Sequence, residues 1–168
     1  MSAVMVENPE EAETYRQAYL KAVKLLVTRE HSRMEIDTKL AKRDVPPDVI
    51  ESVLEQLHSD GYQCDVRFAT IFTEQRLRKG FGPLSIRAKL QERGIDRSLI
   101  AEVINELDTD WVAQAVQALE SRFSSSELAD NSQRQRGRIA RFLQSRGFSP
   151  STSHRALDNC LHRLIDET

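Results

Sequence analysis

The 168-residue sequence has few of the residues that form turns, disulfides and membrane spans. Only six glycines and five prolines occur, and this scarcity favours helices over a fold of many short strands. The two cysteines, Cys64 and Cys160, are far apart, which favours reduced thiols over a disulfide. No apolar run approaches the roughly 18 residues of a membrane span, and the N-terminus lacks the apolar core of a secretion signal. These absences predict a helical, cytoplasmic protein without a membrane segment.

No group of side chains has the pattern of a catalytic or metal site. His58 and Cys64 lie six residues apart across a predicted helix end, which is a poor zinc pattern. The segment 80–83 lacks the Gly-Lys-Ser/Thr ending of a phosphate-binding loop. We interpret it as a tight turn and helix start, although its two glycines would let a phosphate approach the next helix. We therefore expect no enzymatic activity, no metal and no cofactor.

The sequence does contain an internal repeat of about fifty residues. Apolar residues of segment 32–57 recur fifty positions later in 82–107, at the i, i+3, i+4 spacing of a helix face. A third, weaker copy follows at an offset of fifty-three. The matched positions are Ile36, Leu40, Val49, Ile50, Val53, Leu54 and Leu57; then Ile86, Leu90, Leu99, Ile100, Val103, Ile104 and Leu107; then Ile139, Leu143, Ala156, Leu157 and Cys160.

Each copy is predicted to contain three helices. Ser32 and Glu35 have the spacing of a capping box, in which two side chains satisfy free amides at a helix start. Gly61, Gly94 and Gly147 each follow a predicted helix and suit the left-handed conformation that ends one. The predicted helices are 12–30, 32–41 and 47–59; 65–79, 83–91 and 97–107; and 110–123, 133–145 and 150–165.

The predicted fold is therefore all-α, with three tandem three-helix, helix-turn-helix-like repeats in an elongated, curved array. We expect an N-terminal extension over residues 1–14, partly disordered, and repeats over 15–62, 63–108 and 109–168. The last repeat is longer because a polar segment, 124–133, looks like an inserted flexible loop.

Charge alternates along the chain in blocks, although the net charge is only −2. Residues 44–65 and 101–130 are acidic, whereas 66–100 and 134–163 are basic. Because equivalent helices of a repeat array lie on one side, the second helices of repeats two and three could form one positive stripe. Three hypotheses stay open for it: a solvated face with internal ion pairs, a surface that follows phosphates, or a docking face for an acidic protein.

The residues that carry this pattern also resemble a known family, RecX. The stretch 18–40 resembles its opening repeat, and residues 141–148 resemble its third-repeat motif. Its central signature is matched by Lys79-Gly-Phe-Gly-Pro-Leu-Ser-Ile-Arg-Ala-Lys-Leu-Gln-Glu-Arg-Gly-Ile95. One departure follows Gly61-Tyr62, where the family has Leu and paired acids but this chain has Gln63-Cys64-Asp65.

The resemblance implies a non-enzymatic regulator of homologous recombination and the SOS response. Proteins of this family bind filaments of the RecA recombinase and contact DNA. We thus expect inhibition of RecA ATPase, strand exchange and filament growth by a monomer that also binds single- and double-stranded DNA weakly and without sequence preference. A stand-alone helix-turn-helix DNA-binding regulator is the alternative. The candidate contacts to RecA or DNA are Arg76, Arg78, Lys79, Arg87, Lys89, Arg93, Arg97, Arg136, Arg138 and Arg141.

Overall fold

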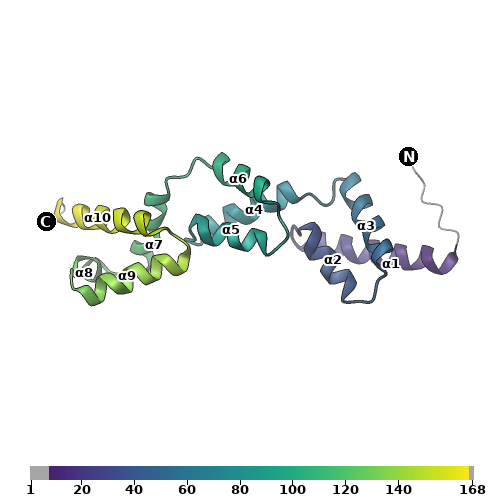
Figure 1. Cartoon of the computed structure of the whole chain (residues 1–168), viewed down its shortest axis with the longest axis horizontal. Coiled ribbons are helices and arrows are strands. Elements are labelled where there is room, and N and C mark those ends of the chain that lie inside the picture. Colours follow the sequence, from purple (N-terminus) through teal and green to yellow (C-terminus); the bar gives the residue numbers. More distant parts are fainter. Residues whose placement is uncertain (1–7, 167–168) are drawn as a thin grey trace. The chain divides into compact units, whose positions relative to one another are not determined.

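The computed structural model describes residues 8–166. Within this range the chain forms ten helices and no strand, as Figure 1 shows. Residues 1–7, half of the predicted N-terminal extension, lie outside the described residues. The helices are α1 (Pro9–Thr28), α2 (Arg33–Ala41), α3 (Pro47–Ser59), α4 (Asp65–Arg78), α5 (Pro83–Gln91), α6 (Arg97–Glu106), α7 (Trp111–Arg122), α8 (Ser125–Ala129), α9 (Gln133–Arg146) and α10 (Pro150–Asp166).

The described residues group into two compact units. The first contains 8–71 and the short turn 93–96, and the second contains 72–92 and 97–166. We describe each unit by itself.

In the first unit, α1, α2 and α3 enclose one apolar core. The apolar residues that the repeat singled out in α2 and α3 are buried, except Val49, which is partly buried and packs against the same core. The capping box at the start of α2 is also present, since the Ser32 side chain accepts from the Glu35 amide. The core residues are Ala18, Ala22, Ile36, Leu40, Ile50, Val53, Leu54 and Leu57.

In the second unit, helices α7 to α10 enclose another core. Cys160 is buried in it and replaces the leucine of the other copies, and burial raises the pKa of its thiol. The segment 124–133, predicted to be a flexible loop, contains the short helix α8. A second capping box explains this helix, because Ser124 and Glu127 satisfy each other's backbone amides. The core residues are Val112, Ala115, Val116, Ala118, Leu119, Phe123, Leu128, Ile139, Leu143, Phe148, Ala156, Leu157 and Cys160.

Each unit also contains a glycine turn that packs on the start of a second helix. In the first unit, the Ser32 hydroxyl donates to the Arg93 carbonyl over 2.7 Å. In the second unit, the amide of Gly82 donates to the Arg146 carbonyl over 2.8 Å, and the amide of Leu84 donates to the Gly147 carbonyl over 3.0 Å. The backbone at residues 94 and 147 is left-handed, as predicted.

Segment 80–83 forms the tight turn and helix start that the sequence predicts, since α5 begins at Pro83. The subsidiary expectation, that its glycines would let a phosphate approach the helix amides, is not met at Gly82 and Leu84. Their amides donate to the carbonyl oxygens of Arg146 and Gly147. Gly82 is needed for that close approach, since a Cβ there would lie 2.5 Å from the Gly147 oxygen.

Candidate functional site

The predicted contact residues have different surroundings in the structure. Arg93 lies in the first unit, where its Nε is 3.5 Å from a carboxylate oxygen of Glu35. Lys89 forms an ion pair of 2.8 Å with Glu92 on its own helix end. These two cations already have carboxylate partners, so they are weaker candidates for an external contact.

Four other predicted residues are more available. Arg78, Lys79 and Arg97 are exposed, and Arg87 on α5 is half-buried. Their side chains make no hydrogen bond or ion pair with any residue in the described part of the chain. A cation without an internal partner keeps its full charge for an external anion.

Arg76 has a third kind of environment, because its guanidinium lies against aromatic rings. Its Cζ is 4.2 Å from the centre of the Phe81 ring and 5.5 Å from that of Phe72. Arg146 contacts the same Phe81 ring at 4.7 Å and donates a hydrogen bond to the Lys79 carbonyl over 3.0 Å. Cation–π contacts hold both guanidinium groups in place without neutralising them.

The same pattern continues into α7 and α9. Arg146 also lies 5.3 Å from the Phe142 ring, whose edge packs on Phe123 at 5.4 Å between ring centres. Arg122 and Arg138 contact the Phe123 ring at 5.4 and 5.2 Å. We call this connected set the arginine–phenylalanine chain. Its members are Phe72, Arg76, Phe81, Arg146, Phe142, Phe123, Arg122 and Arg138.

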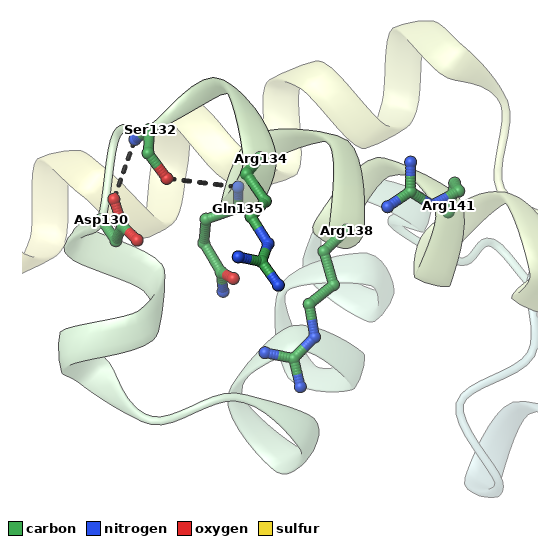
Figure 2. A pocket seen from close by; sticks show the side chains of 6 residues that line it. All are labelled: Asp130, Ser132, Arg134, Gln135, Arg138 and Arg141. Carbon is green, nitrogen blue, oxygen red and sulfur yellow. Dashed lines mark hydrogen bonds between the residues drawn. The ribbon is translucent and has the colours of Figure 1, made fainter.

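A pocket of about 490 Å³ lies on α9, and Arg138 of the arginine–phenylalanine chain lines it. Three arginines at positions i, i+4 and i+7 line it, which places them on one face of the helix. Figure 2 shows Arg134 and Arg138 extending from α9 toward the same side, with Arg141 farther along the helix. Within the described residues, the side chains of Arg134 and Arg141 form no hydrogen bond or ion pair. The full lining is Asp130, Ser132, Arg134, Gln135, Arg138 and Arg141.

One carboxylate lies beside this pocket. Glu127 is 2.9 Å from Arg138, and hydrogen bonds from the backbone and side chain of Ser124, with Arg138, lower the pKa of Glu127. Arg136, a predicted contact residue, is not on the lining and donates to the side chain of Asn131 over 3.1 Å.

Two arginines of this region were not among the predicted contact residues. They are Arg134, which lines the pocket, and Arg146, which contacts the Phe81 ring. The helical spacing of Arg134 from Arg138 and Arg141 could have placed it on their face. No sequence signal relates Arg146 to Phe81, since that contact depends on how the turn after α9 packs on α5.

The described residues include no cluster of histidine, cysteine and acidic side chains that could hold a metal. No helix among them is long and apolar enough to cross a membrane. The distinctive chemistry of this part of the chain is therefore an arginine-rich surface with interleaved aromatic rings, which suits an extended anionic partner.

Comparison with known proteins decides the family. Three models, describing the first, second and third three-helix domains of RecX, match residues 18–57, 65–104 and 108–157 in order. The chain belongs to the RecX family. This is a family of regulatory proteins without enzymatic activity.

Individual RecX proteins are similar over most of their length. The regulatory protein RecX of Halorhodospira halophila is 41% identical over 76% of this chain and 78% of its own. That of Pseudomonas fluorescens is 37% identical over 81% of this chain and 86% of its own. The crystal structure of RecX from Lactobacillus salivarius has the same fold, with a TM-score of 0.74 and 23% identity over 92% of this chain and 98% of that one. The three tandem three-helix domains predicted from the repeat are thus confirmed.

Proposed function

We propose that this RecX-family chain regulates homologous recombination and the SOS response by binding RecA nucleoprotein filaments. Binding inhibits RecA ATPase, strand exchange and filament growth. The observation that carries the proposal is the arginine–phenylalanine chain together with the arginine-lined pocket of α9. Arginines held on rings or left unpaired are ready to bind an extended anionic surface such as a DNA–protein filament.

The proposed contact starts with the unpaired and ring-bound arginines of the second unit. Arg134 and Arg141 present two unpaired charges along one helix face, and Arg138 between them is shared with Glu127. Arg76 and Arg146 add two charges around Phe81. Rigid positioning lowers the entropy lost when each guanidinium binds a phosphate or carboxylate. The exposed cations Arg78, Lys79, Arg97 and Arg136, with the half-buried Arg87, extend the same surface in the proposal.

Filament growth requires that new RecA subunits reach the filament end and their neighbours. A chain of tandem domains can contact adjacent subunits at once, because the contact area grows with the number of domains. Its weak, sequence-independent affinity for single- and double-stranded DNA would add phosphate contacts whose strength falls with salt. The protein acts in the cytoplasm in this proposal, where RecA filaments form.

A stand-alone helix-turn-helix DNA-binding regulator is the second candidate, because each domain has three helices. Such a protein reads bases from a recognition helix and prefers particular sequences. The cations of α5 and α9 are Arg and Lys, neither helix contains Asn, and Gln135 of α9 is buried with its side-chain amide donating to the Glu127 carbonyl. This arrangement favours phosphate contacts over base reading.

One experiment separates the two candidates. RecA-catalysed ATP hydrolysis on single-stranded DNA is measured while the protein is titrated in. We expect inhibition at or below one protein per RecA monomer. Full ATPase activity at stoichiometric amounts, with sequence-selective binding to duplex DNA, would reject the RecA proposal in favour of the second candidate.

A further inference from the structure

All three repeats have the same turn after their second helix, with one difference. The turns read Arg43-Asp44-Val45, Arg93-Gly94-Ile95 and Arg146-Gly147-Phe148. The central residue is left-handed in each, with φ of 58° at Asp44, 77° at Gly94 and 89° at Gly147. Since all three backbones share this conformation, the conformation alone does not explain why the first turn has Asp where the others have Gly.

Packing explains the two glycines. The Gly94 turn lies on α2, and a Cβ at Gly94 would be 2.7 Å from the Met34 Cβ. The Gly147 turn lies on α5, and a Cβ at Gly147 would be 2.3 Å from the Ser85 amide nitrogen. In both docked turns the helix brings atoms so close that the turn has no room for a side chain.

The second helix of the third repeat, α9, is the counterpart of α2 and α5, and within residues 8–166 no turn packs on it in this way. At the position of Met34 in α2 and Leu84 in α5, this helix has Gly137. A Cβ at Gly137 would meet only the Arg141 Nη1 within 4 Å, at 3.5 Å. The helix surface is thus bare where α2 presents Met34 to its docked turn, and at the position of Ser85, which meets the turn docked on α5, α9 has Arg138.

Arg134, Arg138 and Arg141 surround this bare surface and line the pocket of α9. In helical spacing, Gly137 lies on the same face, between Arg134 and Arg141. The open counterpart of the docking sites is therefore shaped to accept a side chain, and its charge selects an acidic one.

The first turn has the complementary features. Asp44 carries a side chain where the docked turns have glycine, and that side chain is exposed and acidic. In the docked pair of α2, the helix has Met34 and the turn has Gly94. In the proposed pair, the helix has Gly137 and the turn has Asp44. Compared with the docked turns, the turn 43–45 has gained a side chain and a negative charge. Compared with α2, the α9 face has lost a side chain at Gly137 and is lined by arginines.

We propose that a second copy of this chain docks head to tail, with the turn 43–45 of one copy on the α9 face of the next. The Asp44 carboxylate sits over Gly137 and pairs with the surrounding arginines, continuing the pattern of the internal docked turns. The interface is heterologous, since each copy contributes a different surface. Such docking goes beyond the proposed function and does not depend on RecA; it differs from the monomer that the sequence predicts.

Sedimentation velocity of the full chain at rising concentration tests the proposal. A contact made by one three-residue turn on one helix face is smaller than the roughly 1,200 Å² that stable complexes bury. We therefore expect weak association that is visible only toward about 1 mM protein. Asp44→Asn keeps a residue that tolerates the left-handed conformation but removes the charge. It should raise the dissociation constant at least tenfold, and Asp44→Lys should abolish association. Circular dichroism and thermal unfolding of each variant verify the fold.

A mixing experiment identifies the two surfaces. Asp44→Lys leaves the α9 face intact, whereas the double variant Arg134→Asp, Arg141→Asp leaves the turn intact. We expect each variant alone to be monomeric and their equimolar mixture to form dimers but nothing larger. Wild-type protein that stays monomeric at about 1 mM, or Asp44 variants that associate like wild type, would overturn the proposal. Loss of DNA binding on changing the arginines, with no effect of Asp44 on association, would assign the pocket to nucleic acid instead.

Discussion

Arginine side chains contact different kinds of partner in the two units, mainly carboxylates in the first and mainly phenylalanine rings in the second. In the first unit, five of them pair with carboxylates, at Arg16–Glu13, Arg29–Glu35, Arg33–Glu51, Arg67–Glu30 and Arg93–Glu35. In the second unit, Arg76, Arg122 and Arg146 lie on phenylalanine rings, and Arg138 contacts both a ring and Glu127. The second unit also has carboxylate pairs, at Arg138–Glu127 and Arg163–Glu120, but Arg76, Arg122 and Arg146 are held on rings that leave their charge available.

This difference follows from which residues surround the bases. The first unit places acids such as Glu30 and Glu35 within reach of its arginines. The basic segments of the second unit contain few acids and are interleaved with Phe81 and Phe142. A ring holds a guanidinium by its quadrupole and does not cancel its charge. A count of basic residues alone therefore overstates how many cations of the first unit are open to an external anion.

The largest effect is expected when the arginines of α9 are reversed. Changing Arg134, Arg138 and Arg141 together to Glu should lower affinity for single-stranded DNA by about 100-fold and reduce the salt slope by roughly 2, since three phosphate contacts are lost and each contributes about 0.7 on a single strand. Fluorescence anisotropy at several salt concentrations measures both. Reversing Arg16, Lys21 and Lys24 on α1 changes net charge equally and is the matched control. Equal losses in the two triple variants would remove the distinction between the units.

A substitution in the first unit should affect stability but not binding. The Glu35 side chain is 16% exposed and accepts from both Arg29 and the Ser32 amide. Burial opposes its ionisation, but the hydrogen bonds from Arg29 prevail and lower the pKa of Glu35. Glu35→Gln should therefore cost about 2 kcal/mol of unfolding free energy.

Urea unfolding measures this cost, and Glu51→Gln is the control because the Glu51 side chain is 60% exposed. The control should cost less than about 0.5 kcal/mol. Weaker inhibition of RecA by Glu35→Gln at a temperature where it is fully folded would contradict the assignment of binding to the second unit.

Removing the ring shared by Arg76 and Arg146 should have a somewhat smaller effect. Phe81→Leu keeps apolar volume but removes two cation–π contacts, at a cost of about 1–1.5 kcal/mol. A double-mutant cycle with Arg146→Met isolates the pair, and the coupling should be about 0.5–1 kcal/mol. A coupling near zero would mean that Phe81 is only a packing residue.

A smaller effect on folding stability is expected from lowering the pH, through the protonation of the buried side chain of His31. His31 is buried; its Nδ1 lies 3.0 Å from the Arg29 carbonyl and its Nε2 lies 2.9 Å from the Lys39 Nζ. Burial lowers the pKa of His31 from its ordinary 6.5. The unfolded chain then binds the proton more tightly, so stability is full above pH 6.5 and falls as the pH drops below it.

Thermal unfolding between pH 7.5 and 5 checks this direction. His31→Gln cannot titrate and serves as the comparison, so the difference between the two proteins isolates His31. An identical pH dependence in both would show that the histidine does not contribute.

The smallest effect is expected at Arg16, on the exposed surface of α1. Its pair with Glu13 joins two side chains that are 67% and 48% exposed. Arg16→Ala should leave the unfolding free energy almost unchanged, because such pairs are screened by water. A clear loss of stability in urea unfolding would show that carboxylate pairing in the first unit is stronger than this account holds.

Local signals were sufficient to predict most of the fold. Helices α3 and α5 begin at Pro47 and Pro83 as predicted, because proline suits the first helical position and apolar spacing defines the rest. Helix α1 begins three residues earlier than predicted, since the Asn8 side chain accepts from the Glu10 amide and Pro9 opens the helix. Helix α8 was missed because its capping box lies within a polar run.

The candidate site could be predicted only in part. The basic segments are visible in the sequence, but the partner of each arginine depends on tertiary packing. Arg93 was expected to be available, and the structure pairs it with Glu35 of a distant segment. Arg146 was overlooked, and the structure places it on Phe81 through the docking of its turn on α5. Spacing along one helix cannot report such contacts.

Site-specific photocrosslinking on RecA–DNA filaments tests the central claim most directly. A benzophenone amino acid replaces Arg141 or Arg87 in the second unit, or Lys21 in the first, and each labelled protein is irradiated on the filament. The account predicts crosslinks to RecA or DNA from positions 141 and 87 and a background level from position 21. Crosslinks from position 21 alone, with background at the other two, would contradict it.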